Sequence, residues 1–343
     1  MTHNEANGRA DRKRSRAHRW TRRFLVVLGC MGLAVGAKQF RDMRCLRALE
    51  QYDRHTPLNV RVASRQNKNG FVREEFCFDN GHGEAVPVLA MIPKGDGKRF
   101  PAIILLYGIG MNMKFADELA EAVTQAGFAL FVPEQFNRGQ RRQRGLTGWQ
   151  QLMALRRRIV LTVQEARRLA DVLEKRPEID PQRIYFWGAS FGAMTGCASV
   201  AYDERFQAAI FTLSGGDLQR MVADTPYRKK LPGFSWVKVA APLAASWLRP
   251  FDPILHVGKI APRPLLFQNA RNDDLIPRSG VEALFQAAGQ PKEILWYDST
   301  HDHQPRQTIE QFVRDALAWL QQRDREIRSN LPGNREKTTA AEH

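Results

Sequence analysis

A serine flanked by glycines is the residue in this sequence best suited to covalent chemistry. Residues 188–192 read Gly-Ala-Ser-Phe-Gly and place Ser190 in a G-x-S-x-G pattern. An apolar run at 183–187 precedes the motif, and small residues typical of a packed helix follow at 193–200. A strand, a sharp turn and a helix in this order would lift the serine hydroxyl above a sheet. The sequence therefore predicts a nucleophile at Ser190.

A serine hydroxyl attacks a carbonyl only when a base takes its proton. Four histidines follow Ser190, and one of them, His256, falls in a proline-rich segment. His301 comes just after the run 294–298, whose first four residues are apolar. A loop after that strand would bring the imidazole to the sheet edge that carries the serine. We predict His301 as the base, with His303 as the alternative.

The third member of such a site is an acid, which we expect after the preceding apolar run, 264–267. Asp273 and Asp274 both follow that run, and Asp273 stands three residues before Ile276-Pro277. We favour Asp273 and keep Asp274 as the alternative. The carboxylate would hold the imidazole tautomer and stabilise the imidazolium without taking the proton itself.

Acyl transfer also needs hydrogen-bond donors for the negative charge that develops on the carbonyl oxygen. The run 104–110 reads Ile-Leu-Leu-Tyr-Gly-Ile-Gly, an apolar strand ending in a glycine-rich turn. The backbone N–H groups of Ile109 and Phe191 are the predicted oxyanion donors, each worth about 3–4 kcal/mol. A glycine-rich turn can also hold phosphate, but the G-x-G-x-x-G and P-loop patterns of phosphate sites are missing.

The elements that would position these residues follow an alternating rhythm. Continuous apolar runs alternate with amphipathic helical patterns from residue 101 onwards, the runs lying at 102–107, 128–132, 184–187, 208–213, 264–267 and 294–297. Helical patterns lie at 115–126, 149–173 and 309–320. Fully apolar strands alternating with helices are typical of a parallel sheet covered on both faces. We predict a doubly wound, mostly parallel α/β fold, preceded by two further strands at 71–78 and 85–92 joined through an Asn80-Gly81 turn.

We expect the catalytic domain to span residues 51–322. Between 217 and 259 five prolines interrupt the rhythm, which indicates a small cap insertion over the site or, alternatively, a surface excursion. Trp236, Trp247 and Phe251 are candidates for a substrate pocket in this insertion, although they could equally pack it onto the body. Residues 323–343 are polar and charged, and we expect a disordered tail.

The first 50 residues carry twelve Lys and Arg against four acidic residues, within a chain of net charge +16. Residues 24–37 carry no charge, and this run is shorter than the about 20 residues of a membrane span. It suits the hydrophobic region of a signal peptide. We predict a signal peptide or membrane anchor, with the body exported to a bacterial cell envelope or periplasm. A cytoplasmic location is the alternative, because Lys38, Arg41, Arg44 and Arg47 follow the apolar run.

The basic head could also serve nucleic-acid binding. No DNA- or RNA-binding motif accompanies it, so we predict no nucleic-acid partner. Four cysteines show no CxxC spacing and no histidine cluster, and we expect neither a metal nor a cofactor.

The blocks 107–110, 188–192, 273–277 and His301, in this order, resemble the α/β-hydrolase superfamily. The segments 101–110, 133–139 and 263–277 are similar to the branch that holds dienelactone hydrolases, acetyl-xylan-type esterases and prolyl-oligopeptidase-like catalytic domains. The resemblance covers about residues 60–322. It departs at Ser190, where dienelactone hydrolases have cysteine, and at Tyr107, where many relatives have histidine.

This resemblance implies a serine hydrolase that cleaves small carboxylic esters through an acyl-enzyme, using Ser190, His301 and Asp273. Two alternatives stay open. One is a serine peptidase of the same fold, which would normally carry a large accessory domain. The other is a non-catalytic binding protein that keeps the fold.

Overall fold

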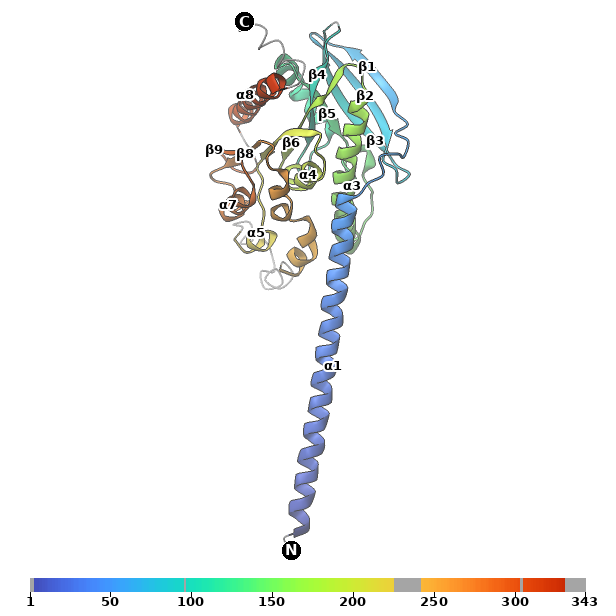
Figure 1. The fold of residues 1–343 in the computed structure, drawn as a ribbon, viewed down its shortest axis with the longest axis vertical. Coiled ribbons are helices and arrows are strands. Elements are labelled where there is room, and N and C mark those ends of the chain that lie inside the picture. The colour runs from blue at the N-terminus through green and yellow to red at the C-terminus, as the bar shows by residue number, and fades with distance from the viewer. Residues whose placement is uncertain (1–2, 96, 225–241, 303–304, 331–343) are drawn as a thin grey trace. The chain divides into compact units, whose positions relative to one another are not determined.

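The computed structural model describes residues 3–95, 97–224, 242–302 and 305–330, and it divides into two compact units, Met1–Arg47 and Ala48–His343 (Figure 1). The helix α1 (His3–Glu50) makes up the described part of the first unit and ends in the second. Its segment Phe24–Glu50 is long and apolar enough to cross a membrane, a test of length and composition that an N-terminal signal sequence also passes.

Within the described part of the second unit, nine strands form one sheet in the order β1-β2-β3-β5-β4-β6-β7-β8-β9. The strands are β1 (Arg61–Asn67), β2 (Phe71–Asp79), β3 (Ala85–Pro93), β4 (Phe100–Leu106), β5 (Ala129–Pro133), β6 (Ile179–Ala189), β7 (Phe206–Thr212), β8 (Leu265–Ala270) and β9 (Lys292–Tyr297). The pairs β1/β2, β2/β3 and β3/β5 are antiparallel, and all pairs from β5/β4 to β8/β9 are parallel. The prediction of a mostly parallel α/β sheet is confirmed.

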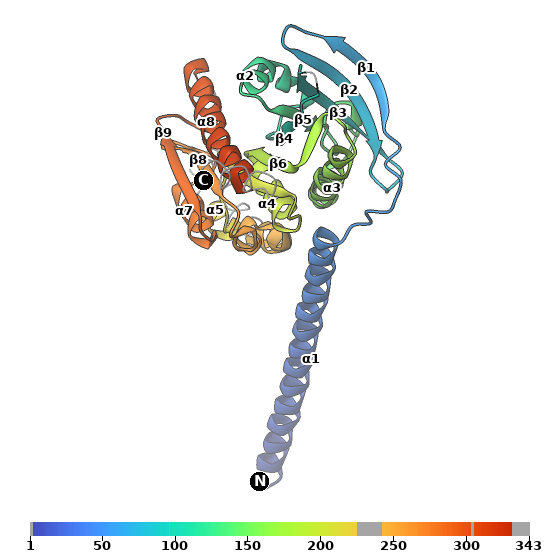
Figure 2. The same cartoon turned by 45° about the horizontal axis from the view of Figure 1, so that its top comes forward.

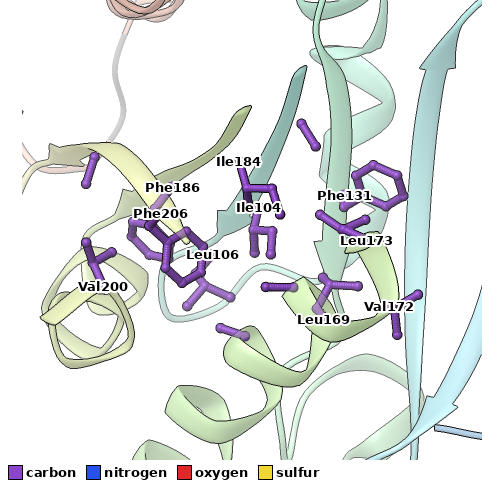
Figure 3. Close-up of a cluster of buried hydrophobic side chains, with 14 of the residues drawn as sticks. Ile104, Leu106, Phe131, Leu169, Val172, Leu173, Ile184, Phe186, Val200 and Phe206 are labelled. Atoms are coloured by element: carbon purple, nitrogen blue, oxygen red, sulfur yellow. The ribbon is translucent and has the colours of Figure 1, made fainter. Parts of the chain in front are cut away.

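Helices cover both faces of the sheet (Figure 2). The helices α3 (Gly148–Glu174) and α4 (Phe191–Ala201) pack on one face, and α2 (Ala120–Gln125) and α8 (Arg306–Asn330) on the other. Successive residues of the buried strand β4 point to opposite faces. Ile104 joins the cluster that contains Leu169 of α3 (Figure 3), whereas Ile103 joins the cluster that contains Val123 of α2.

Local sequence explains where the helices begin. Thr147 caps α3 in a capping box with Gln150, and this pairing satisfies two backbone N–H groups that the first turn leaves free. The helix expected over 115–126 is instead two pieces, η1 (Met113–Glu118) and α2. The Asn112 side chain accepts a hydrogen bond from the Lys114 backbone and starts the first piece as a tight turn.

The expectation of a disordered tail from residue 323 is wrong for residues 323–330, which continue α8 to Asn330. Asp324 explains the difference, because its buried carboxylate accepts hydrogen bonds from Arg183 at 2.7 and 2.8 Å and from the Tyr185 hydroxyl at 2.8 Å. A polar composition does not reveal such partners. Residues 331–343 lie outside the described residues.

The described parts of the insertion at 217–259 are helical and short. They comprise α5 (Leu218–Asp224), a helical stretch at 242–248, and the 3₁₀ turns η4 (Arg249–Phe251), η5 (Pro253–Leu255) and η6 (Val257–Ile260). The buried Asp252 carboxylate accepts hydrogen bonds from the Asp217 and Leu218 backbone at 2.9 and 2.7 Å, so it ties the two ends of the insertion together.

Arg168 of α3 holds the segment that precedes β1 and the end of β2 by hydrogen bonds. Its buried guanidinium donates hydrogen bonds to the carbonyl groups of Asp53, Thr56, Pro57 and Asp79. We expect Arg168→Met to lower the free energy of unfolding by about 3 kcal/mol or more, because several buried acceptors would lose their donor. Urea unfolding measures the change. Arg306→Gln is the control, since that side chain is 92% exposed, and equal effects of the two variants would refute this role.

His256 in the insertion is buried in its neutral form. Its Nε2–H donates to the Pro250 carbonyl at 2.9 Å, and its Nδ1 lies 2.9 Å from the Tyr202 hydroxyl. Burial, with a smaller contribution from the nearby Lys259, lowers the pKa of His256 from 6.5 to about 4, against the opposing effects of the Pro250 hydrogen bond and of Glu50.

The unfolded chain therefore takes up a proton at His256 at a pH where the folded protein does not. We expect the free energy of unfolding to fall by up to about 3 kcal/mol as the pH drops from 6.5 to about 4. Urea unfolding at about pH 7.5 and about pH 4.5 measures this slope. His256→Gln should flatten it, and an unchanged slope in the variant would contradict the assignment.

Candidate active site

The nucleophile candidate lies at a strained turn between β6 and α4. Ser190 has φ 51° and ψ −117°, a conformation that is costly for a residue with a side chain. Close packing enforces the turn: a Cβ on Gly188 would lie 2.5 Å from Ala193 Cα, and one on Gly192 would lie 2.2 Å from the Leu106 carbonyl oxygen. The two glycines of the motif are therefore required by the approach of the flanking backbone.

The structure brings Ser190 together with both of its expected partners. Ser190 Oγ lies 2.9 Å from His301 Nε2, and His301 Nδ1 lies 2.8 Å from Asp273 Oδ2. His301 stands in the loop after β9 and Asp273 in the loop after β8. Both partners are nearly excluded from water, with side-chain exposures of 6% and 5%. A hydroxyl, an imidazole and a carboxylate in such a row can transfer a proton away from the serine.

Backbone donors hold the carboxylate in place. Asp273 Oδ1 accepts hydrogen bonds from the backbone N–H groups of Leu275 at 2.9 Å and Ile276 at 2.7 Å. Its other oxygen is left to face the imidazole, so the carboxylate at His301 Nδ1 belongs to Asp273 rather than to its neighbour Asp274. The alternative base, His303, lies outside the described residues.

The two predicted oxyanion donors are each next in sequence to a residue at the elbow. The turn after β4 lies against the elbow, because a Cβ on Gly108 would be 3.3 Å from Ser190 Cβ and 3.8 Å from its Oγ. Within the described residues, the backbone N–H groups of Ile109 and Phe191 donate to no other group. Free N–H groups at a turn and at a helix N-terminus suit a developing oxyanion.

A polar network behind this turn was not predicted from the sequence. The Tyr107 hydroxyl donates to the Glu134 carboxylate and accepts from the Gln135 backbone at 2.9 Å, while the Gln135 side chain donates to the Tyr107 carbonyl at 2.7 Å. Burial, followed by the nearby Glu134 charge, raises the pKa of Tyr107 well above its usual value, so this hydroxyl stays protonated. The network fixes the turn that carries Ile109. Its only sequence signal was tyrosine at a position where relatives have histidine.

Two of the aromatic residues predicted to line a substrate pocket contact an arginine of α3. Trp247 and the buried Phe251 both lie against the guanidinium of Arg156 on α3, at 4.6 and 5.4 Å from the ring centroids. Their role in substrate binding stays a prediction. Trp236 lies outside the described residues.

Comparison with known proteins agrees with this architecture. Residues 157–324 match the model of the prolyl oligopeptidase family. No curated protein matches the sequence. Solved structures do match: an acetyl xylan esterase from Paenibacillus sp. R4 has a TM-score of 0.62 and 20% identity, over 80% of this chain and 93% of that one.

Two further structures are similar in the same way. Acetyl xylan esterase 1 from Thermoanaerobacterium sp. JW/SL YS485 has a TM-score of 0.63 and 20% identity, over 82% of this chain and 93% of that one. The glucuronoyl esterase from Solibacter usitatus has a TM-score of 0.53 and 18% identity, over 82% and 92%. The fold class is that of the α/β-hydrolases. The solved structures that share this fold include acetyl xylan esterases.

Proposed function

We propose that the protein is a serine hydrolase that cleaves carboxylic esters through an acyl-enzyme. One observation carries the proposal: Ser190, His301 and Asp273 form a hydrogen-bonded row at the turn between β6 and α4, with distances of 2.9 and 2.8 Å. Three loops that are far apart in the sequence converge there. The serine has a strained backbone and its partner imidazole is buried, and a purely structural role explains neither feature.

In the first step His301 Nε2 takes the proton of Ser190 as Oγ attacks the ester carbonyl carbon. The carbonyl oxygen becomes an oxyanion that accepts hydrogen bonds from the Ile109 and Phe191 N–H groups. His301 then gives its proton to the departing alcohol, which leaves the acyl group on Ser190. In the second step His301 takes a proton from water, which attacks the acyl carbon, and the proton returns to Ser190 as the acid leaves. Asp273 keeps Nδ1 protonated throughout.

The structural neighbours favour an ester substrate, because the acetyl xylan and glucuronoyl esterases share this fold over most of their length. The family match to prolyl oligopeptidases favours an amide substrate as the second candidate. A panel of p-nitrophenyl esters of rising acyl length, compared with dipeptide p-nitroanilides, separates the two. We expect ester cleavage to be much faster. Faster cleavage of the anilides would replace the esterase assignment with a peptidase.

We further propose that the N-terminal segment exports or anchors the body, as its one membrane-length helix suggests. The mature N-terminus, sequenced from envelope fractions of an expressing bacterium, tests this. Cleavage near Ala37 indicates a signal peptide, and an intact chain in the membrane fraction indicates an anchor. An intact chain in the soluble cytoplasm would refute the proposal.

A further inference from the structure

A basic cavity is lined in part by Arg158, whose guanidinium also lies against the ring of Phe191. It has a volume of about 820 Å³, and four arginines line it: Arg138, Arg142, Arg144 and Arg158. No acidic side chain is among its lining residues in the described part of the chain. Like charges gathered around one space without counter-charges repel each other, so a cavity of this kind favours an anion.

Arg158 is the buried member of this group, with an exposure of 4%. Its Nη2 donates to Gln135 Oε1 at 2.9 Å, and its buried Nε has no partner within the described residues. Arg138 likewise has a buried Nε without a partner there. A buried charge usually has a counter-charge, because the desolvation cost is otherwise large. Within the described residues, Arg158 is therefore a buried cation with no carboxylate partner and with one unused N–H group.

Two other buried arginines, Arg141 and Arg183, show what carboxylate partners provide. Arg141 pairs with Glu165 at 2.7 Å and Glu84 at 2.8 Å, and Arg183 pairs with Asp324 at 2.7 Å. Burial lowers the pKa of both arginines, but the paired carboxylates outweigh it, so that both pKa values are raised overall. Burial and the nearby Arg138 instead lower the pKa of Arg158 to about 9. The environment of Arg158 is short of negative charge, and a bound anion would supply it.

The cavity is connected to the reacting group through Phe191. The Arg158 guanidinium lies 4.1 Å from the centroid of the Phe191 ring, and Phe191 directly follows the nucleophile. Gln135 positions Arg158 and is itself bonded to Tyr107, the first residue of the oxyanion turn. A substrate that reaches from Ser190 past the Phe191 ring would place its other end at Arg158. The neighbouring carboxylate, Glu134, is engaged by the Tyr107 hydroxyl.

We propose that this cavity is a substrate subsite for a carboxylate, so that the preferred ester carries a negatively charged group. A planar guanidinium with free N–H groups matches the two oxygens of a carboxylate in a bidentate arrangement. Arg138 and the more exposed Arg142 and Arg144 would attract the anion and add to the field. The inference rests on the proposed esterase function and names its substrate class.

Matched ester pairs that differ only in charge test the subsite in the full-length enzyme. The first pair is para-acetoxybenzoate and its methyl ester, which place the charge on the alcohol side. The second pair is mono-p-nitrophenyl adipate and methyl p-nitrophenyl adipate, which place it on the acyl side. We expect kcat/KM to favour the anion by roughly tenfold to a hundredfold in at least one pair. Added salt should reduce the part of this preference that comes from the exposed arginines.

Charge-removing variants assign the preference to the cavity. Arg158→Gln should reduce the ratio of anionic to neutral kcat/KM by about tenfold or more, and Arg158→Lys should restore part of it. Arg142→Gln, at an exposed position, should reduce the ratio by a smaller factor. This variant replaces Arg158→Gln as the test if Arg158→Gln does not fold. Arg157→Gln is the matched control, because Arg157 neighbours Arg158 on α3 but points to Glu84 at 2.6 Å and does not line the cavity.

The outcomes separate this inference from the proposed function. Hydrolysis of neutral esters with a ratio near one in both pairs would overturn the subsite and leave the esterase intact. No hydrolysis of any ester would overturn the function and the subsite together. A preference for para-acetoxyphenyl phosphate over both carboxylate probes would replace the carboxylate with a phosphate. A preference for anionic esters that neither Arg158→Gln nor Arg142→Gln changes would show that the charged group of the substrate binds outside this cavity.

Discussion

Ser190→Ala is expected to lower kcat/KM for ester substrates by about 10⁵-fold to 10⁶-fold, because the nucleophile and its activating base act as one unit. The remaining rate would come from the oxyanion donors and substrate binding alone. Initial rates on the best p-nitrophenyl ester measure the loss. Removing the hydroxyl leaves no other group in the described structure without a hydrogen-bond partner except His301 Nε2. We therefore expect the variant to keep its fold.

The matched control is Ser199→Ala, on the same helix. Ser199 is buried and donates to the Val163 carbonyl at 3.4 Å, so its loss tests the cost of removing a serine hydroxyl from α4 away from the elbow. This variant should keep its activity. A loss of less than tenfold in Ser190→Ala, with circular dichroism unchanged, would exclude a serine nucleophile at the elbow.

Asp273→Asn is expected to lower kcat by about 10⁴-fold at neutral pH. An amide in this place can present its N–H₂ group to Nδ1, which favours the tautomer with the proton on Nε2. That tautomer cannot accept the proton of Ser190, although the geometry is retained. Rates with the same ester measure the effect, and ester binding should change much less than kcat.

Asp274→Asn distinguishes the two candidate acids. It removes a neighbouring negative charge without touching the 2.8 Å contact between Asp273 and His301. We expect a loss of less than about tenfold. If Asp274→Asn gave the large loss and Asp273→Asn the small one, the assignment of the acid would be reversed.

The alternation of apolar runs was enough to predict the parallel strands and the helices α3 and α8. Buried parallel strands are apolar along their whole length, as β4 and β5 are, and this pattern is visible without a structure. The strand β1 was not singled out, because its sequence Arg-Val-Ala-Ser-Arg-Gln-Asn is polar and its side chains are mostly exposed at the sheet edge. The helical continuation to Asn330 was missed for a similar reason, since its anchor is one charged residue, Asp324.

Ser190, Asp273 and His301 could be proposed from the sequence because each follows a strand. Parallel strands bring their carboxyl ends to one edge of the sheet. Side chains whose positions depend on residues distant in the sequence could not be predicted. The Arg158 guanidinium meets Gln135 and Phe191 only after α3 has packed beside β5 and α4, so its position on a charged helix gave no signal. The same holds for the buried hydrogen-bonded chain Trp187–Thr212–Gln268, which links the neighbouring strands β6, β7 and β8.

Labelling with a fluorophosphonate is the most direct test of a base-activated serine at the elbow. Such a reagent reacts covalently with activated serines, and mass spectrometry of the digested protein locates the adduct. The account predicts a single adduct on Ser190, formed slowly or not at all in a variant with His301→Ala. A native, folded protein that takes no label, or that carries it on another serine, would contradict it.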